Sequence, residues 1–191
     1  MAHIVPHWNF KGMEGQEILV TVYTNCDELE LFLNGQSLGR KAIEKYGHGE
    51  WNVVYTPGSL EVKGYRKGVE VANHKRITTG KPETLRLTLD NTCSRNGTDV
   101  ALFTCECLDE KGNPVPDASE FVRFSVEEPA RILGTGSDHC DHNNVTDPQR
   151  KMYMGKIRVA VKPAQGQTSL TLTAIGDTCG CTCIQVELPE T

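Results

Sequence analysis

The sequence is poor in aromatic residues, in long apolar runs and in positive charge. Aromatic side chains make up 6% of the 191 residues, and 20 Lys+Arg stand against 25 Asp+Glu, which gives a net charge of -5 at pH 7. This balance offers neither the basic surface that binds nucleic acid nor a polybasic patch for a membrane surface. No apolar run approaches the roughly 20 residues that span a bilayer. We therefore expect no nucleic-acid partner and no membrane association.

The beginning of the chain lacks the charged head and apolar stretch of a secretory signal peptide. Strand-like sequence follows with almost no leader. We therefore expect a cytoplasmic protein and a piece cut from a longer chain.

The eight cysteines include no Cys-x-x-Cys motif, and their spacing does not predict a disulfide framework. Cys105 and Cys107 alternate with other residues, as do Cys179, Cys181 and Cys183, which puts each set on one face of a strand. We expect these sets to fill cores as reduced thiols, with cross-strand disulfides as the alternative. Alternate strand residues lie about 6.6 Å apart, too far for zinc-bound sulfurs, so the sequence predicts no metal and no cofactor.

The length exceeds the roughly 100 residues of one sandwich and favours two modules. A polar segment with Gly and Pro, residues 79–83, separates two strand-rich regions. The predicted fold is all-β, with tandem immunoglobulin-like β-sandwich domains at 1–80 and 81–191; a barrel is the alternative. Apolar alternation predicts strands at 17–23, 28–33, 37–40, 51–55, 60–65, 69–72, 85–89, 100–108, 121–126, 156–161, 169–174 and 181–188.

The strongest local signal is a hairpin. Leu29, Leu31 and Leu33 alternate, and Asn34-Gly35 then supplies the positive φ angles of a type I′ turn. On the same strand Glu28 and Glu30 point away from the leucines, so we interpret them as a solvated face and not as an acid/base pair.

Two stretches of the first half carry a resemblance to a known family. Pro6-His7-Trp8-Asn9-Phe10 and the segment from Tyr23 to Gly35 resemble the domain that follows the catalytic barrel in bacterial β-galactosidases of glycoside hydrolase family 2. In the second half, Lys111 to Asp117, Phe124 to Val126 and Ile132 to Ser137 are similar to that family's C-terminal immunoglobulin-like domain.

The resemblance implies a parent enzyme that hydrolyses terminal β-galactosides with two glutamates, one acid/base and one nucleophile. In the family both lie on the preceding (β/α)₈ barrel, so no residue of this chain is predicted to be catalytic. The expected function is that of a non-catalytic accessory region, with the parent's own barrel and other domains, and a homo-oligomer of the parent, as partners. The alternative is an autonomous carbohydrate-binding or adhesin-like module.

Two groups of residues are weaker candidate sites. The loop between Ser137 and Arg150 contains four side chains of metal-ligand type, Asp138, His139, Asp141 and His142. Ligands from contiguous loop residues, however, converge on one ion with difficulty. His7, Trp8, Asn9 and Trp51 are candidates for contact with a sugar or with a neighbouring domain. In a small sandwich such aromatic residues usually belong to the core.

Overall fold

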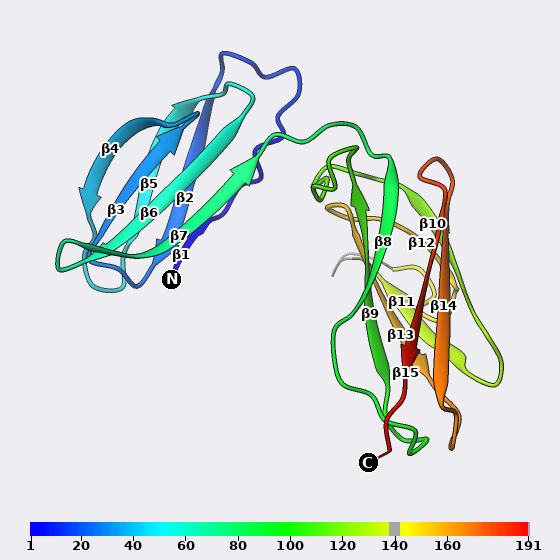
Figure 1. Cartoon of the computed structure of the whole chain (residues 1–191). Helices are drawn as coiled ribbons and strands as arrows, with labels where there is room; N and C mark the ends of the chain where they lie inside the picture. The colour runs from blue at the N-terminus through cyan, green and yellow to red at the C-terminus, as the bar shows by residue number, and fades with distance from the viewer. Residues whose placement is uncertain (138–141, 191) are drawn as a thin grey trace. The chain divides into compact units, whose positions relative to one another are not determined.

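A computed structural model describes residues 1–137 and 142–190. The chain forms two compact units, Met1–Thr78 and Thr79–Thr191. Every regular element in the described residues is a strand, and each unit contains antiparallel sheets that enclose a hydrophobic core (Figure 1). The predicted all-β, immunoglobulin-like class is confirmed. No described segment forms a helix able to cross a membrane.

The first unit has a three-stranded and a four-stranded sheet. Their strand orders are β1-β2-β5 and β4-β3-β6-β7. The strands are β1 (Ala2–Ile4), β2 (Glu17–Thr24), β3 (Glu28–Leu33), β4 (Gln36–Ala42), β5 (His48–Val54), β6 (Ser59–Arg66) and β7 (Val69–Ile77). Alternate residues of β2, β3, β5 and β6 are buried, as expected for strands with one face on a core. All seven residues of β4, by contrast, are exposed.

The predicted hairpin is confirmed. Asn34 and Gly35 both have positive φ, 50° and 84°, and they join β3 to β4. The side-chain amide of Asn34 also holds the segment that leads into β6. Its Oδ1 accepts a hydrogen bond from Ser59 N at 2.7 Å, and its Nδ2 donates to Pro57 O at 3.2 Å. Leu29 and Leu31 are fully buried and Leu33 is half-buried.

The second unit has two four-stranded sheets, of order β11-β13-β9-β8 and β12-β10-β14-β15. The strands are β8 (Thr84–Leu89), β9 (Ala101–Leu108), β10 (Phe121–Val126), β11 (Arg131–Gly136), β12 (Gln149–Lys151), β13 (Lys156–Lys162), β14 (Ser169–Gly176) and β15 (Cys181–Glu187). Aliphatic side chains from both sheets, Phe103, Phe124 and several thiols fill the space between them.

The cysteines divide between core and surface. Cys105 and Cys107 are buried on one face of β9, as expected, and Cys179 is buried as well. The expected burial of Cys181 and Cys183 is wrong, because both are exposed. The reason is the β14–β15 turn: Gly180 has a φ of +72°, which ends the alternation, and β15 begins at Cys181 with its thiol outward.

Candidate functional site

The candidate residues around Trp8 form an aromatic cluster inside the first unit. Trp8 is fully buried, and its ring meets that of Tyr55 edge-on at a centroid distance of 5.1 Å. Its indole Nε1 donates to Thr56 O at 3.1 Å, and Thr78 Oγ1 donates to Trp8 O at 2.6 Å. Phe10 completes the cluster, 6.0 Å from Trp8. The structure therefore places the Trp8 ring where the unit's own side chains cover it.

His7 and Asn9 flank Trp8 and form a local turn. The His7 ring stacks on Phe10 at 4.6 Å, and its Nδ1 accepts a hydrogen bond from Asn9 N at 3.1 Å. His7 is half-buried, whereas Asn9 is 8% exposed. Of the four residues proposed for sugar or interdomain contact, His7 is therefore the most accessible.

Trp51, the fourth candidate, lies on β5 and is 6% exposed. The Lys41 ammonium of β4 sits 4.8 Å from the centre of its ring and also hydrogen-bonds to Glu50 O. The Trp51 Nε1 has no hydrogen-bond partner, alone among the fully buried side-chain N and O atoms of the described residues. Trp51 is thus a core residue whose ring makes a cation–π contact with Lys41.

The candidate metal loop is described only in part. Asp138, His139 and Asp141 lie outside the described residues, and His142 is exposed. Among the residues that are described, no three His, Cys, Asp or Glu side chains lie close enough together to hold a metal ion.

A buried arginine organises the described part of that loop. Arg150 is 2% exposed, and its guanidinium donates to Thr135 Oγ1 at 3.2 Å and to Thr135 O at 2.9 Å. It also donates to Asn144 O at 2.8 Å, which ties the loop to β11. Sequence reasoning placed Arg150 at the end of a polar stretch and missed this role.

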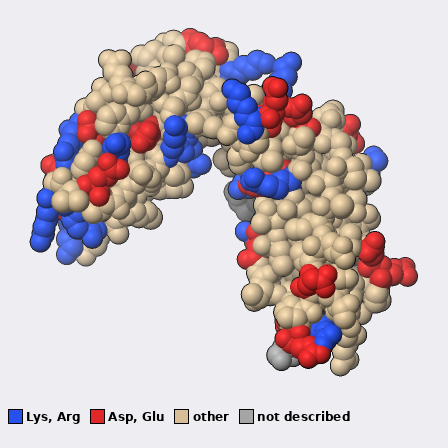
Figure 2. Space-filling model, in the orientation of Figure 1, with Lys and Arg blue, Asp and Glu red and all other residues tan. Residues whose placement is uncertain are grey.

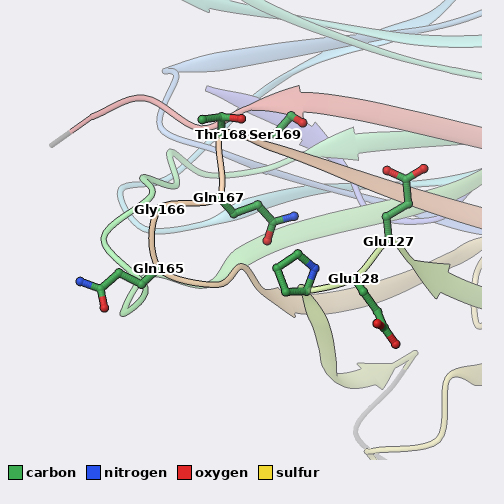
Figure 3. Close-up of a pocket in the computed structure, with 8 residues that line it drawn as sticks. Glu127, Glu128, Gln165, Gly166, Gln167, Thr168 and Ser169 are labelled. Atoms are coloured by element: carbon green, nitrogen blue, oxygen red, sulfur yellow. The ribbon is translucent and has the colours of Figure 1, made fainter.

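An open polar cleft of about 410 Å³ lies at one end of the second unit. Two turns line it, residues 127–129 and 165–169, and the Glu128-Pro129 peptide bond is cis. In Figure 3 the amide group of Gln167 points toward the side of the cleft formed by Glu127 and Glu128, whose carboxylates point in opposite directions. Because these carboxylates do not converge, the cleft does not have the paired-carboxylate geometry of a glycosidase active site.

Glu120 is a second buried charge that sequence reasoning missed. Its carboxylate accepts hydrogen bonds from Thr178 N at 2.5 Å, Thr178 Oγ1 at 2.8 Å and Cys179 N at 3.2 Å. Burial by itself raises the pKa of Glu120, but these bonds outweigh it and hold the pKa below its usual value. A lone acidic residue between Ser119 and Phe121 carries no sequence signal for such a contact.

Surface charge differs between the units. The first contains nine basic and nine acidic residues, whereas the second contains eleven basic and sixteen acidic residues, so the second carries the whole net charge of -5. Both signs are interspersed with uncharged surface on the face seen in Figure 2.

Two protein families match most of the chain, one in each unit. Residues 85–184, just over half of the sequence, match glycoside hydrolase family 2 C-terminal domain 5. The chain belongs to this family. Residues 15–72 match a domain of unknown function, DUF4982.

Relatives of this family 2 chain are much longer proteins. A β-galactosidase of Bacteroides ovatus is 38% identical over 183 residues, which cover 91% of this chain and 21% of the relative. A β-glucuronidase of Formosa agariphila is 28% identical over 177 residues, 90% of this chain and 18% of the relative. The chain therefore spans about a fifth of the length of the curated relatives it matches.

Solved structures agree with this family assignment. A crystal structure of a β-glycosidase from Bacteroides vulgatus matches 98% of this chain with a TM-score of 0.91 and 32% identity, over 24% of that chain. A family 2 glycosyl hydrolase from Bacteroides cellulosilyticus matches 97% of this chain, and 28% of its own, with a TM-score of 0.88 and 33% identity.

Proposed function

We propose that this chain is a non-catalytic accessory region of a β-galactosidase, with the first unit following the catalytic barrel and the second at the C-terminal side. One observation carries the proposal: a β-galactosidase aligns with 91% of this chain, yet the chain spans only 21% of that relative. The described residues that most resemble an acid/base pair, Glu127 and Glu128, diverge. The galactoside substrate is inferred from this relative, and the β-glucuronidase relative makes a glucuronide the competing substrate.

The outer face of the β1-β2-β5 sheet is the surface we assign to contact with the catalytic part of such an enzyme. Leu19 and Tyr23 on β2 and Val54 on β5 are 55%, 53% and 50% exposed. The Leu19 and Tyr23 side chains share one face, because they are four residues apart on one strand, and Glu17 of that face pairs with Val54. Clustered exposed apolar side chains are typical of an interface.

The direct test of this function has two parts. The isolated chain should show no turnover of 4-nitrophenyl β-galactoside or 4-nitrophenyl β-glucuronide, and turnover of either substrate by the isolated chain would contradict the proposal. In the longer enzyme, Leu19→Lys should lower the melting temperature of the catalytic part. The matched control is Leu102→Lys, on a 37% exposed leucine of β9 in the second unit, which should leave that temperature unchanged.

The alternative function, autonomous carbohydrate binding, is favoured by the polar cleft of the second unit. Its carboxylate, amide and hydroxyl groups are those that hydrogen-bond sugar hydroxyls. Isothermal titration of the chain with galactose and lactose separates the two functions. Measurable heat that disappears in Gln167→Ala would favour the binding module, and its absence would favour the accessory role.

We propose the cytoplasm as the location. Five of the seven described cysteines are buried among core side chains, a use of cysteine typical of proteins kept in a reducing compartment.

A further inference from the structure

Two buried thiols of the second unit face one another between its sheets. Cys107 lies on β9, and Cys179 lies in the turn that joins β14 to β15 of the opposite sheet. Their sulfur atoms are 3.3 Å apart, although the residues are 72 positions apart in the sequence. Cys107 is 0% exposed and Cys179 is 4% exposed. We propose that Cys107 and Cys179 form a modification site, at which a small-molecule disulfide oxidises the pair to a disulfide that clasps the two sheets together.

The backbone on both sides of the pair is held in place. Cys107 N donates to Gly155 O at 3.0 Å, and Cys107 O accepts from Val115 N at 2.9 Å. On the other side, the carboxylate of Glu120 binds the backbone N–H groups of Thr178 and Cys179. A disulfide has a sulfur–sulfur distance of about 2.05 Å, so the fixed pair must close by roughly 1.3 Å.

Three other described cysteines are poorer partners. Cys105 is also buried, but it lies two positions from Cys107 on the same strand face, where side chains are about 6.6 Å apart. Cys181 and Cys183 are exposed on the outward face of β15, away from the core that holds Cys107. Only the 107–179 pair has its two sulfur atoms in contact among the described cysteines.

The order of reaction follows from exposure. Burial raises the pKa of Cys107 to about 12, so this residue is a thiol at neutral pH and not the first nucleophile. Cys179 is 4% exposed and lies between the exposed residues Thr178 and Gly180, so it is the nearer of the two thiols to solvent. Its thiolate attacks one sulfur of the oxidant, forms a mixed disulfide and releases one thiolate. Cys107 then loses its proton and attacks the Cys179 sulfur, which releases the second thiolate. The protein loses two protons and two electrons, and the oxidant becomes two thiols.

The test exposes the full chain to glutathione disulfide, blocks the remaining thiols with iodoacetamide and maps tryptic peptides by mass spectrometry. No Lys or Arg separates Cys179 from Cys181 and Cys183, so the background is the C181S/C183S double variant. We expect a cross-linked pair of peptides that contain Cys107 and Cys179. Cys107→Ala should abolish it and the matched Cys105→Ala should not, because both lie in one tryptic peptide.

A melting measurement on the native chain tests whether the disulfide stabilises the second unit, and it needs no variant. Closure of a loop of 72 residues should raise the melting temperature of the second unit by on the order of 10 °C, and dithiothreitol should reverse the shift. The proposal is overturned if Cys107 and Cys179 are both alkylated after exposure to glutathione disulfide, if Cys105→Ala abolishes the cross-link, or if the cross-linked chain melts at an unchanged temperature.

Discussion

In the core of the first unit aliphatic side chains pack with three aromatic rings, whereas in the core of the second unit they pack with two phenylalanines and four thiols. Eight of the twelve aromatic residues belong to the first unit, and seven of the eight cysteines belong to the second. Both units are nevertheless antiparallel sandwiches of similar design. The difference shows that this architecture specifies which positions are buried but not which types of side chain occupy them. The buried cluster of the first unit contains no cysteine, so thiol chemistry inside a core concerns the second unit.

The largest expected effect comes from Trp8. Trp8→Ala removes a fully buried indole together with its contacts to Phe10 and Tyr55, and should lower the free energy of unfolding of the first unit by about 3–5 kcal/mol. Tyr46, which is 93% exposed, provides the aromatic control, since Tyr46→Ala should change stability little. Differential scanning calorimetry measures both. An equal loss in the second unit's transition would show that the two cores do not unfold separately.

Glu120→Ala should give the next largest effect, in the second unit. It removes the acceptor of three hydrogen bonds from Thr178 and Cys179 and should cost about 2 kcal/mol in urea unfolding. Glu110→Ala is the control, because Glu110 is exposed in the same unit. Equal effects of the two substitutions would show that the hydrogen bonds of Glu120 do not stabilise the β14–β15 turn.

The hairpin of the first unit provides a purely conformational test. Gly35 has a φ of +84°, and no neighbouring atom lies within 4 Å of the position that a β-carbon would take, so Gly35→Ala should cost about 1–2 kcal/mol through the backbone alone. Gly136 of the second unit has equal space without a positive φ, and Gly136→Ala should be nearly neutral. Chemical denaturation of both variants measures the difference, and a loss for Gly136→Ala as large as for Gly35→Ala contradicts this explanation.

The smallest effect is a pH dependence confined to the first unit. His74 Nδ1 accepts a hydrogen bond from Ile4 N at 2.9 Å, which requires that nitrogen to be unprotonated. Burial, and then the nearby Arg76 and His3, lower the pKa of His74 below its usual 6.5. The stabilisation is therefore complete above about pH 6.5 and is lost as the pH falls through the folded-state pKa.

The matched variant for this effect is His74→Asn, which offers Ile4 an acceptor that does not titrate. Melting temperatures measured between about pH 7 and pH 5 should fall less steeply for the first unit of this variant than for the native chain. Parallel curves would exclude His74 as the titrating group.

The sequence predicted the strands whose alternation is clear and missed those whose signal is short or broken. The residues of β3 and β10 were predicted to the same bounds, because apolar residues alternate in both and turn residues flank them. β1 and β12 have three residues each, too few for periodicity, and β11 contains two glycines. The units meet at 78/79, and the predicted domain division at 80/81 stays a prediction.

The candidate site was harder to predict than the fold, because its contacts join distant segments. Glu120 meets Thr178 and Arg150 meets Thr135 through pairings that only the folded sheets create. Cys179 and Cys181 alternate in the sequence, yet a turn between them sends one thiol inward and the other outward. Local spacing therefore predicts a shared face only within one uninterrupted strand.

The complete exposure of β4 has a consequence for solubility. β4 is an edge strand of its sheet, and a flat edge offers unpaired backbone groups to any other strand that reaches it. Here the pairing register with β3 shifts between Glu30 and Phe32, and Arg40 and Lys41 carry charge along the edge. Irregularity and positive charge both oppose the addition of a foreign strand, which protects the chain from edge-to-edge aggregation.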